Sequence, residues 1–161
     1  CEINGMVHSN LRFSNVYGHP GDHETRLVNA FIIKALKAEP LEIHGGGQMF
    51  DFTHIDDTAG GIFAAAELLH NMHESLPQIH VLPGEAVAIE DLAAMVLNIT
   101  DSNSEIVYTP GRDYDVERFH GDPSRMNKIL GYRCSIDIIT GLKKCAALHR
   151  ERLLLVKEAN G

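Results

Sequence analysis

Short extended runs alternate with helical stripes along most of this chain, and that alternation constrains the fold more than any other feature of the sequence. Extended runs are predicted at residues 6–13, 41–44, 50–55, 79–82 and 106–109. Helices are predicted at 25–38, after 56, at 89–99, from Asp122 or Ser124 to Leu130, and after 135. Strands that alternate with helices in this way predict an α/β fold.

The ends and faces of two helices are also predicted. Asp56 and Asp57 are expected to cap one helix, because their carboxylates accept free backbone N–H bonds of a first turn and oppose the helix dipole. Its buried face is expected to consist of Ala59, Ile62, Phe63, Ala66 and Leu69. Ser135 is predicted to cap the last helix, which Gly141 weakens, and residues from about 153 to 161 are expected to fray into solvent.

Length and charge exclude several classes of protein. The 161 residues, 44% of them hydrophobic, suit a single region (1–161) with a real core. Fourteen basic against 22 acidic side chains give a net charge of -8, so nucleic acid and anionic membrane surfaces are poor partners. No apolar run approaches the roughly 18 residues of a membrane-spanning helix. Three cysteines without zinc spacing fit a reducing cytosol, and we expect a cytoplasmic protein.

A metal site is not predicted. His19 and His23 are four residues apart, but Pro20 and Gly21 between them prevent the helix that would bring the two rings together. The cysteines are interpreted as small packing residues rather than nucleophiles.

Five segments, in order, resemble motifs of one known family. They are LRFSNVYG at 11–18, EPLEIHG at 39–45, QMFDFTHIDD at 48–57, RDYD at 112–115, and DPSR at 122–125 followed by LGY at 130–132. These segments are similar to those of the extended short-chain dehydrogenases/reductases, the NAD-dependent epimerase/dehydratase family that acts on sugar nucleotides. The resemblance covers roughly residues 7–149.

The resemblance implies the C-terminal portion of a Rossmann-type enzyme, lacking most of the nucleotide-binding sheet. The chain begins at Cys1 without an initiator Met, and we expect it to be a fragment whose 79–82 strand completes the missing sheet. The family's Gly-rich cofactor loop and its Tyr-x-x-x-Lys pair are both absent, since Gly45-Gly46-Gly47 lacks the spacing of a dinucleotide loop and no tyrosine has a lysine four residues on. Without that pair to take the substrate proton, the chain alone is expected to be catalytically inert.

Binding residues are what the resemblance does assign to this chain. Phe13, Ser14 and Asn15 would lie beside the NAD or NADP cofactor, with the Asn15 amide also close to the substrate. The substrate residues would be Asn15, Arg26, Leu27, Glu42, His44, Phe50, Arg112 and Asp115. Arg112 would hold the diphosphate with its guanidinium fork.

A structural role is the alternative for several of these residues. Asn15 equally fits a side chain that satisfies its own turn, and Leu27 fits simple core packing. Glu42 and His44 fit one solvated strand face, and Arg112 fits a surface ion pair with a neighbouring aspartate.

Phe50 departs from the family pattern, which usually has an arginine before Asp-Phe to grip the pyrophosphate. Three explanations are open: Phe50 stacks on a base or sugar instead, the substrate is not a nucleotide diphosphate, or the loop shifts the position that carries the arginine. We therefore predict the substrate-binding portion of an NAD(P)-dependent epimerase or dehydratase of nucleotide sugars, completed by an N-terminal Rossmann half. The alternatives are a non-catalytic binding or assembly module and part of an NADP-dependent reductase of a non-nucleotide carbonyl. An exposed apolar face is expected, with a homodimer as one consequence.

Overall fold

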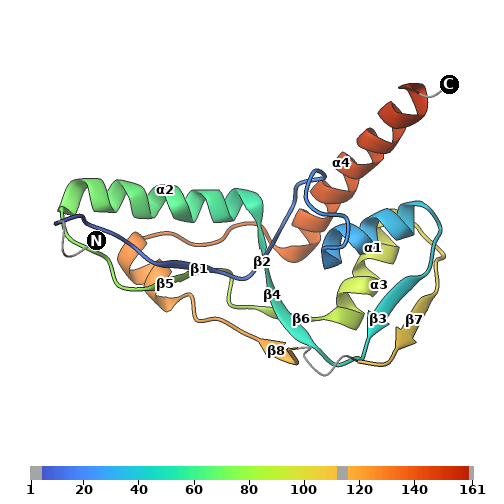
Figure 1. Cartoon of the computed structure of the whole chain (residues 1–161), viewed down its shortest axis with the longest axis horizontal. Helices are drawn as coiled ribbons and strands as arrows, with labels where there is room; N and C mark the ends of the chain where they lie inside the picture. Colours follow the sequence, from blue (N-terminus) through green and yellow to red (C-terminus); the bar gives the residue numbers. More distant parts are fainter. Residues whose placement is uncertain (1–4, 112–115, 160–161) are drawn as a thin grey trace.

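The computed structural model describes residues 5–111 and 116–159, and these form an α/β structure (Figure 1). The helices are α1 (Leu27–Leu36), α2 (Ile55–Met72), α3 (Ile89–Thr100), α4 (Ile138–Ala159) and the short π-helix η2 (Met126–Leu130). The predicted α/β class is confirmed. None of these helices is long and apolar enough to cross a membrane.

The strands pair mostly in parallel. β1 (Leu11–Phe13) pairs in parallel with β5 (Ile79–Val81), and β3 (Leu41–His44) pairs in parallel with β7 (Ile106–Thr109). β4 (Met49–His54) is parallel to β2 (Asn15–Tyr17) and β8 (Arg118–Phe119) and antiparallel to β6 (Ala86–Ala88). The predicted strands are thus present, although the 6–13 run is a strand only at its end.

The protein has two hydrophobic cores, formed mainly by elements that lie in two lobes on either side of β4 in Figure 1. The larger core joins α1, α3, β3 and the start of α4, with Phe31, Ile32 and Leu92 buried at its centre. The smaller core lies under α2 and joins β5 to η2 around Ile79 and Met126. β4 runs between the two lobes, so residues on this strand can reach both.

The exposed face of α2 differs from the sequence prediction. Phe63 is 76% exposed and Ile62 45% exposed, while Thr58, Gly61 and Ala65 are the residues that pack. The reason is close approach, since a Cβ added at Gly61 would lie 2.4 Å from Cγ1 of Val81 on β5. The helix therefore turns its small residues to the sheet and leaves the larger apolar residues in solvent. Of the predicted face, Ala59, Ile62, Phe63 and Ala66 are exposed, and only Leu69 is partly buried.

The predicted helix caps are also wrong in two places. His54 is the N-cap of α2, and its Nδ1 accepts a hydrogen bond from the backbone N–H of Asp56 at 3.2 Å. Asp57 is buried within the first turn and bonds the Tyr132–Ile136 segment instead. At α4, Asp137 rather than Ser135 accepts the N–H of Thr140, at 2.9 Å.

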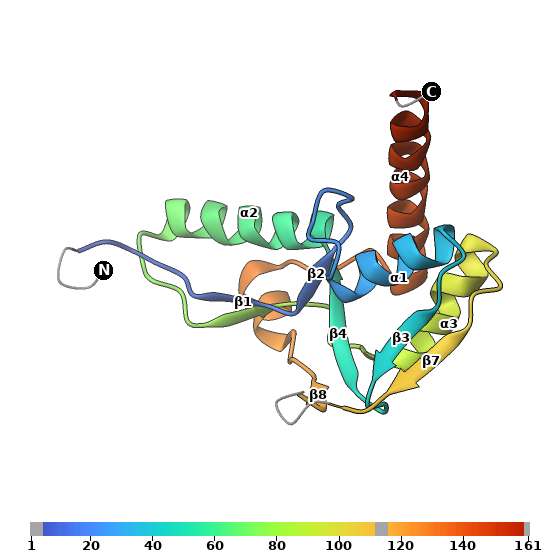
Figure 2. The same ribbon diagram turned by 45° about the vertical axis from the view of Figure 1, so that its right-hand side comes forward.

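α4 is helical to Ala159, and the fraying expected from about residue 153 stays a prediction. Figures 1 and 2 show its last turns projecting away from both lobes. Leu153–Leu155 are good helix formers, so the backbone remains helical although Leu154 and Leu155 are exposed.

Gly141 allows close packing in α4, a role that the low helix propensity of glycine does not indicate. An added Cβ would lie 2.0 Å from the hydroxyl oxygen of the buried Tyr17. At an exposed helix position Gly→Ala stabilises by roughly 0.5–1 kcal/mol. Here we expect Gly141→Ala to lower the free energy of unfolding by about 1–3 kcal/mol, because the overpacked ring must move. Urea unfolding measures the free energy of unfolding of the variant. Adding Tyr17→Phe to Gly141→Ala should recover part of the lost stability. A Gly141→Ala protein that is more stable than the unmodified chain would contradict the prediction.

Candidate functional site

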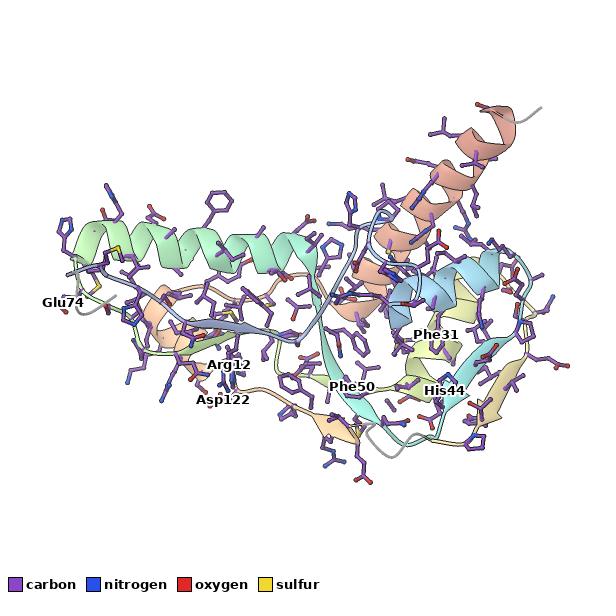
Figure 3. The ribbon with its side chains drawn as sticks, viewed as in Figure 1. Arg12, Phe31, His44, Phe50, Glu74 and Asp122 are labelled. Carbon is purple, nitrogen blue, oxygen red and sulfur yellow. The ribbon has the colours of Figure 1, made fainter. Side chains whose placement is uncertain are left out.

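A groove crosses β2, β4 and the first turn of α1. It consists of three cavities of about 240, 160 and 270 Å³, and Phe50 lines all three. Figure 3 shows Phe50 on β4 between the two lobes and His44 on β3. Because the cavities share this side chain, we treat them as one site, called the groove below.

The groove brings together the described residues that the sequence nominates for binding. The first cavity is lined by Asn15, Arg26, Leu27 and Phe50, the second by Leu27, Glu42, His44 and Phe50, and the third by Phe13, Ser14, Asn15 and Phe50. They come from four separate stretches of sequence. Arg112 and Asp115 lie outside the described residues.

Charged side chains at the groove are mostly paired. Arg26 Nε lies 3.5 Å from Oδ2 of Asp22, four residues earlier in the chain. Glu42 accepts a hydrogen bond of 2.9 Å from Lys34, and this bond, with the lysine charge, lowers the pKa of Glu42. A ligand phosphate would therefore meet Arg26 beside a carboxylate rather than an isolated cation.

Polar residues of the groove are held by neighbouring strands. The Ser14 and Thr53 hydroxyl oxygens are 2.6 Å apart, and Thr109 Oγ1 is 2.6 Å from His44 Nδ1. Phe13 keeps part of its ring exposed at the carboxyl end of β1. The strand ends thus present a rigid edge with one apolar surface, where parallel sheets commonly bind ligands.

Tyr17, which lines the first cavity, forms a buried pair with His54, a contact that sequence patterns did not predict. Their rings meet edge to face with centroids 5.5 Å apart. Burial raises the pKa of Tyr17 and lowers the pKa of His54, so both are neutral near pH 7. Among the described residues neither the Tyr17 hydroxyl nor His54 Nε2 has a hydrogen-bond partner.

Further residues that line the groove were missed, among them the polar Asp22, Asn29 and Gln48. A signal existed for Gln48, since it follows three glycines; its amide donates to the His44 carbonyl at 2.7 Å and accepts from the Gly46 N–H at 3.1 Å. Within residues 5–111 and 116–159 no group of three or more His, Cys, Asp or Glu is arranged for a metal ion.

Comparison with known proteins finds similarity to one family. The NAD dependent epimerase/dehydratase family matches residues 2–76. UDP-glucuronic acid decarboxylase 2 of Arabidopsis thaliana is 28% identical over 88% of this chain and 31% of its own length, and UDP-glucuronate 4-epimerase of Thermodesulfobacterium geofontis is 27% identical over 95% and 46%. The chain is thus similar to the epimerase/dehydratase-like extended short-chain dehydrogenases/reductases.

Solved structures of this family show the same fold. UDP-glucose 4-epimerase of Thermotoga maritima, solved with UDP-glucose, superposes with a TM-score of 0.83 at 26% identity over 92% of this chain and 48% of its own. An epimerase of Methanothermobacter thermautotrophicus reaches 0.86 at 23% identity, covering 98% and 47%. This epimerase/dehydratase-like chain therefore spans about half the length of the relatives it matches, or less. Its predicted fold, part of a Rossmann-type enzyme, is confirmed.

Proposed function

We propose that this chain is the nucleotide-sugar-binding portion of an NAD-dependent epimerase or dehydratase, working in a reducing cytoplasm. The observation that carries the proposal is the groove, where nominated residues from four stretches of sequence converge on Phe50. Its relatives support the substrate class, because their names specify UDP-glucuronate, and solved neighbours contain UDP-glucose or UDP-glucuronic acid.

Each groove residue has a role that its chemistry fits. The Asn15 amide can bond a sugar hydroxyl or a phosphate oxygen, and the Arg26 guanidinium can bond the diphosphate in a fork. Leu27 and Phe50 offer apolar surface to a base or sugar ring, and Glu42 and His44 offer polar atoms at the far cavity. Arg112 and Asp115, by resemblance, complete the diphosphate and sugar contacts.

NAD is the cofactor we propose for the intact enzyme, with NADP as the alternative. The segment Phe13–Asn15 fits its nicotinamide end, because Phe13 presents a partly exposed apolar ring at a parallel strand end and the Ser14 hydroxyl is held by Thr53. When bound, NAD supplies a reversible hydride acceptor for a sugar carbon. This chain's part is to orient the sugar and exclude water at that ring.

The acid–base pair and the cofactor loop are proposed to belong to a Rossmann half, since the sequence contains neither. Two features of the left lobe in Figure 1 support a docking surface for that half. Among the described residues β1 pairs only with β5, leaving one strand edge open, and the exposed Ile62 and Phe63 lie on the helix above it. A parallel sheet is normally longer and covered on both faces. A second copy covering the same face, giving a homodimer, is the alternative.

A second candidate function is favoured by Phe50. Of the described cations, only Arg26 lines the groove, and it is paired with Asp22. An apolar centre with one paired cation suits a carbonyl substrate without a diphosphate, as in an NADP-dependent reductase.

Titration calorimetry with UDP, UDP-glucose, UDP-glucuronic acid, GDP-sugars and NAD tests the proposal. We expect a UDP-sugar to bind, and at 100 times its dissociation constant to stabilise the fold by about 2.7 kcal/mol. Arg26→Ala should weaken binding by roughly tenfold or more, since a charge-assisted bond to phosphate is lost. Arg133→Ala, outside the groove, is the matched control and should bind as the unmodified chain does. Binding of no nucleotide to the chain, alone or with the Rossmann half, would rule the proposal out and leave a reductase or a non-catalytic module.

A further inference from the structure

The wall of the groove next to Arg26 is the loop at residues 18–26, which connects β2 to α1. It supplies Asp22 and Arg26 to the first cavity. Within the loop the Asp22 N–H donates to the His19 carbonyl at 3.2 Å, and the Arg26 N–H donates to the His23 carbonyl at 3.0 Å. These are short-range turns, so the position of the loop over the groove depends on contacts from outside it.

Asn29 provides those contacts from α1. It is 3% exposed, and its amide nitrogen donates to the carbonyls of His19 and Asp22, both at 3.3 Å. Its amide oxygen accepts from Nε2 of His149 at 3.1 Å and lies 3.8 Å from the Cys145 sulfur. All the hydrogen-bonding capacity of the amide is used within the protein, so Asn29 has none left for a ligand although it borders the cavity.

The two partners of the amide oxygen belong to α4, which lines none of the three groove cavities. His149 is 2% exposed, and Cys145 is fully buried. Farther along α4, Arg152 donates to the carbonyl of Pro20, a second link from this helix to the same loop. The amide orientation that binds the loop is thus fixed by the last helix, 120 residues away from Asn29.

We propose that Asn29 and His149 are positioning residues of the groove: through them α4 holds the 18–26 loop in the position that places Arg26 against the ligand. Neither residue contacts the ligand. The ligand itself rests on the proposed function, but the control of the loop by α4 does not.

Hydrogen exchange of the chain, followed by mass spectrometry, tests the loop without any ligand. We expect Asn29→Ala and His149→Leu to speed exchange in peptides covering 18–26 by about tenfold or more, with peptides of β3 and β7 unchanged. His149→Gln keeps an N–H donor of similar reach and should preserve the slow exchange. Arg152→Ala changes an exposed side chain, leaves the fold intact, and should speed exchange around Pro20.

UDP affinity measured on the same variants tests the consequence for the groove. Asn29→Ala and His149→Leu should bind UDP about tenfold more weakly, and His149→Gln should restore binding, which a purely structural role would not predict for variants that remain folded. Unchanged loop exchange in folded Asn29→Ala and His149→Leu, or an equal rise in β3 and β7, would overturn the inference. If the unmodified chain binds no UDP while loop exchange responds as expected, the proposed function fails and the inference about α4 stands.

Discussion

Replacing Asp57 with alanine should lower the free energy of unfolding by about 3–5 kcal/mol. The carboxylate is 2% exposed and accepts bonds from the backbone N–H groups of Ser135 and Ile136, at 3.0 and 2.9 Å, and from the hydroxyls of Tyr132 and Ser135, both at 3.2 Å. Removing it leaves the partly buried donors of Tyr132 and Ile136 without this acceptor, and each unsatisfied buried group costs about 1–3 kcal/mol. Burial and the Asp57 charge also raise the pKa of Tyr132 to about 12, so the phenol remains a donor at neutral pH.

Urea unfolding followed by circular dichroism measures the loss. Asp56→Ala is the matched control, because Asp56 is the exposed neighbour and its partner Lys144 is 3.4 Å away on the surface. That variant should lose no more than about 1 kcal/mol. Equal losses for the two variants would show that the Tyr132–Ile136 segment does not depend on the buried carboxylate.

Introducing a cation at the centre of the groove should change its ligand preference. We expect Phe50→Arg to bind UDP-sugars about tenfold to a hundredfold more tightly, because a guanidinium bonds a diphosphate with about 1.5–3 kcal/mol of charge-assisted energy. Phe50 lines all three cavities, so an arginine there reaches a ligand wherever it lies along the groove.

Titration calorimetry with UDP-glucuronic acid and UDP-glucose measures the gain. Val107→Arg adds the same charge on β7 outside the groove and should leave affinity unchanged. A Phe50→Arg protein with unaltered UDP affinity would argue that no diphosphate lies against β4, which favours the reductase candidate.

Local sequence patterns predicted the order and type of elements well, because strand and helix periods are encoded within about ten residues. The face of α2 was predicted wrongly because the apolar stripe with Ile62 and Phe63 is larger than the packed face, where Gly61 approaches Val81 closely. A short side chain that permits close contact carries no hydrophobic signal. Sequence periodicity cannot detect it.

Some features of the candidate site could be predicted from local sequence, whereas others depend on contacts between distant residues. The groove residues were nominated because they lie in short motifs that resemble family segments. The Asp57 contacts and the Asn29–His149 bond join residues 75 to 120 positions apart, and nothing local to either partner indicates the other. Asp57 was predicted to cap its own helix because acidic residues are favoured at helix starts. Its hydrogen-bond donors come instead from the distant Tyr132–Ile136 segment.

The strand pairings also determine how this chain reaches its native state. Leu11 pairs with Ile79, Leu41 with Ile106 and Met49 with Arg118, so most of the parallel pairs join strands about 65–70 residues apart. Such long-range closure is slow, because the entropy of a large loop is lost before the contacts that repay it form. β1 and β3 precede their partners in the sequence, so their edges stay unpaired until β5 and β7 are available. Collapse of the whole chain is therefore expected to follow completion of its second half.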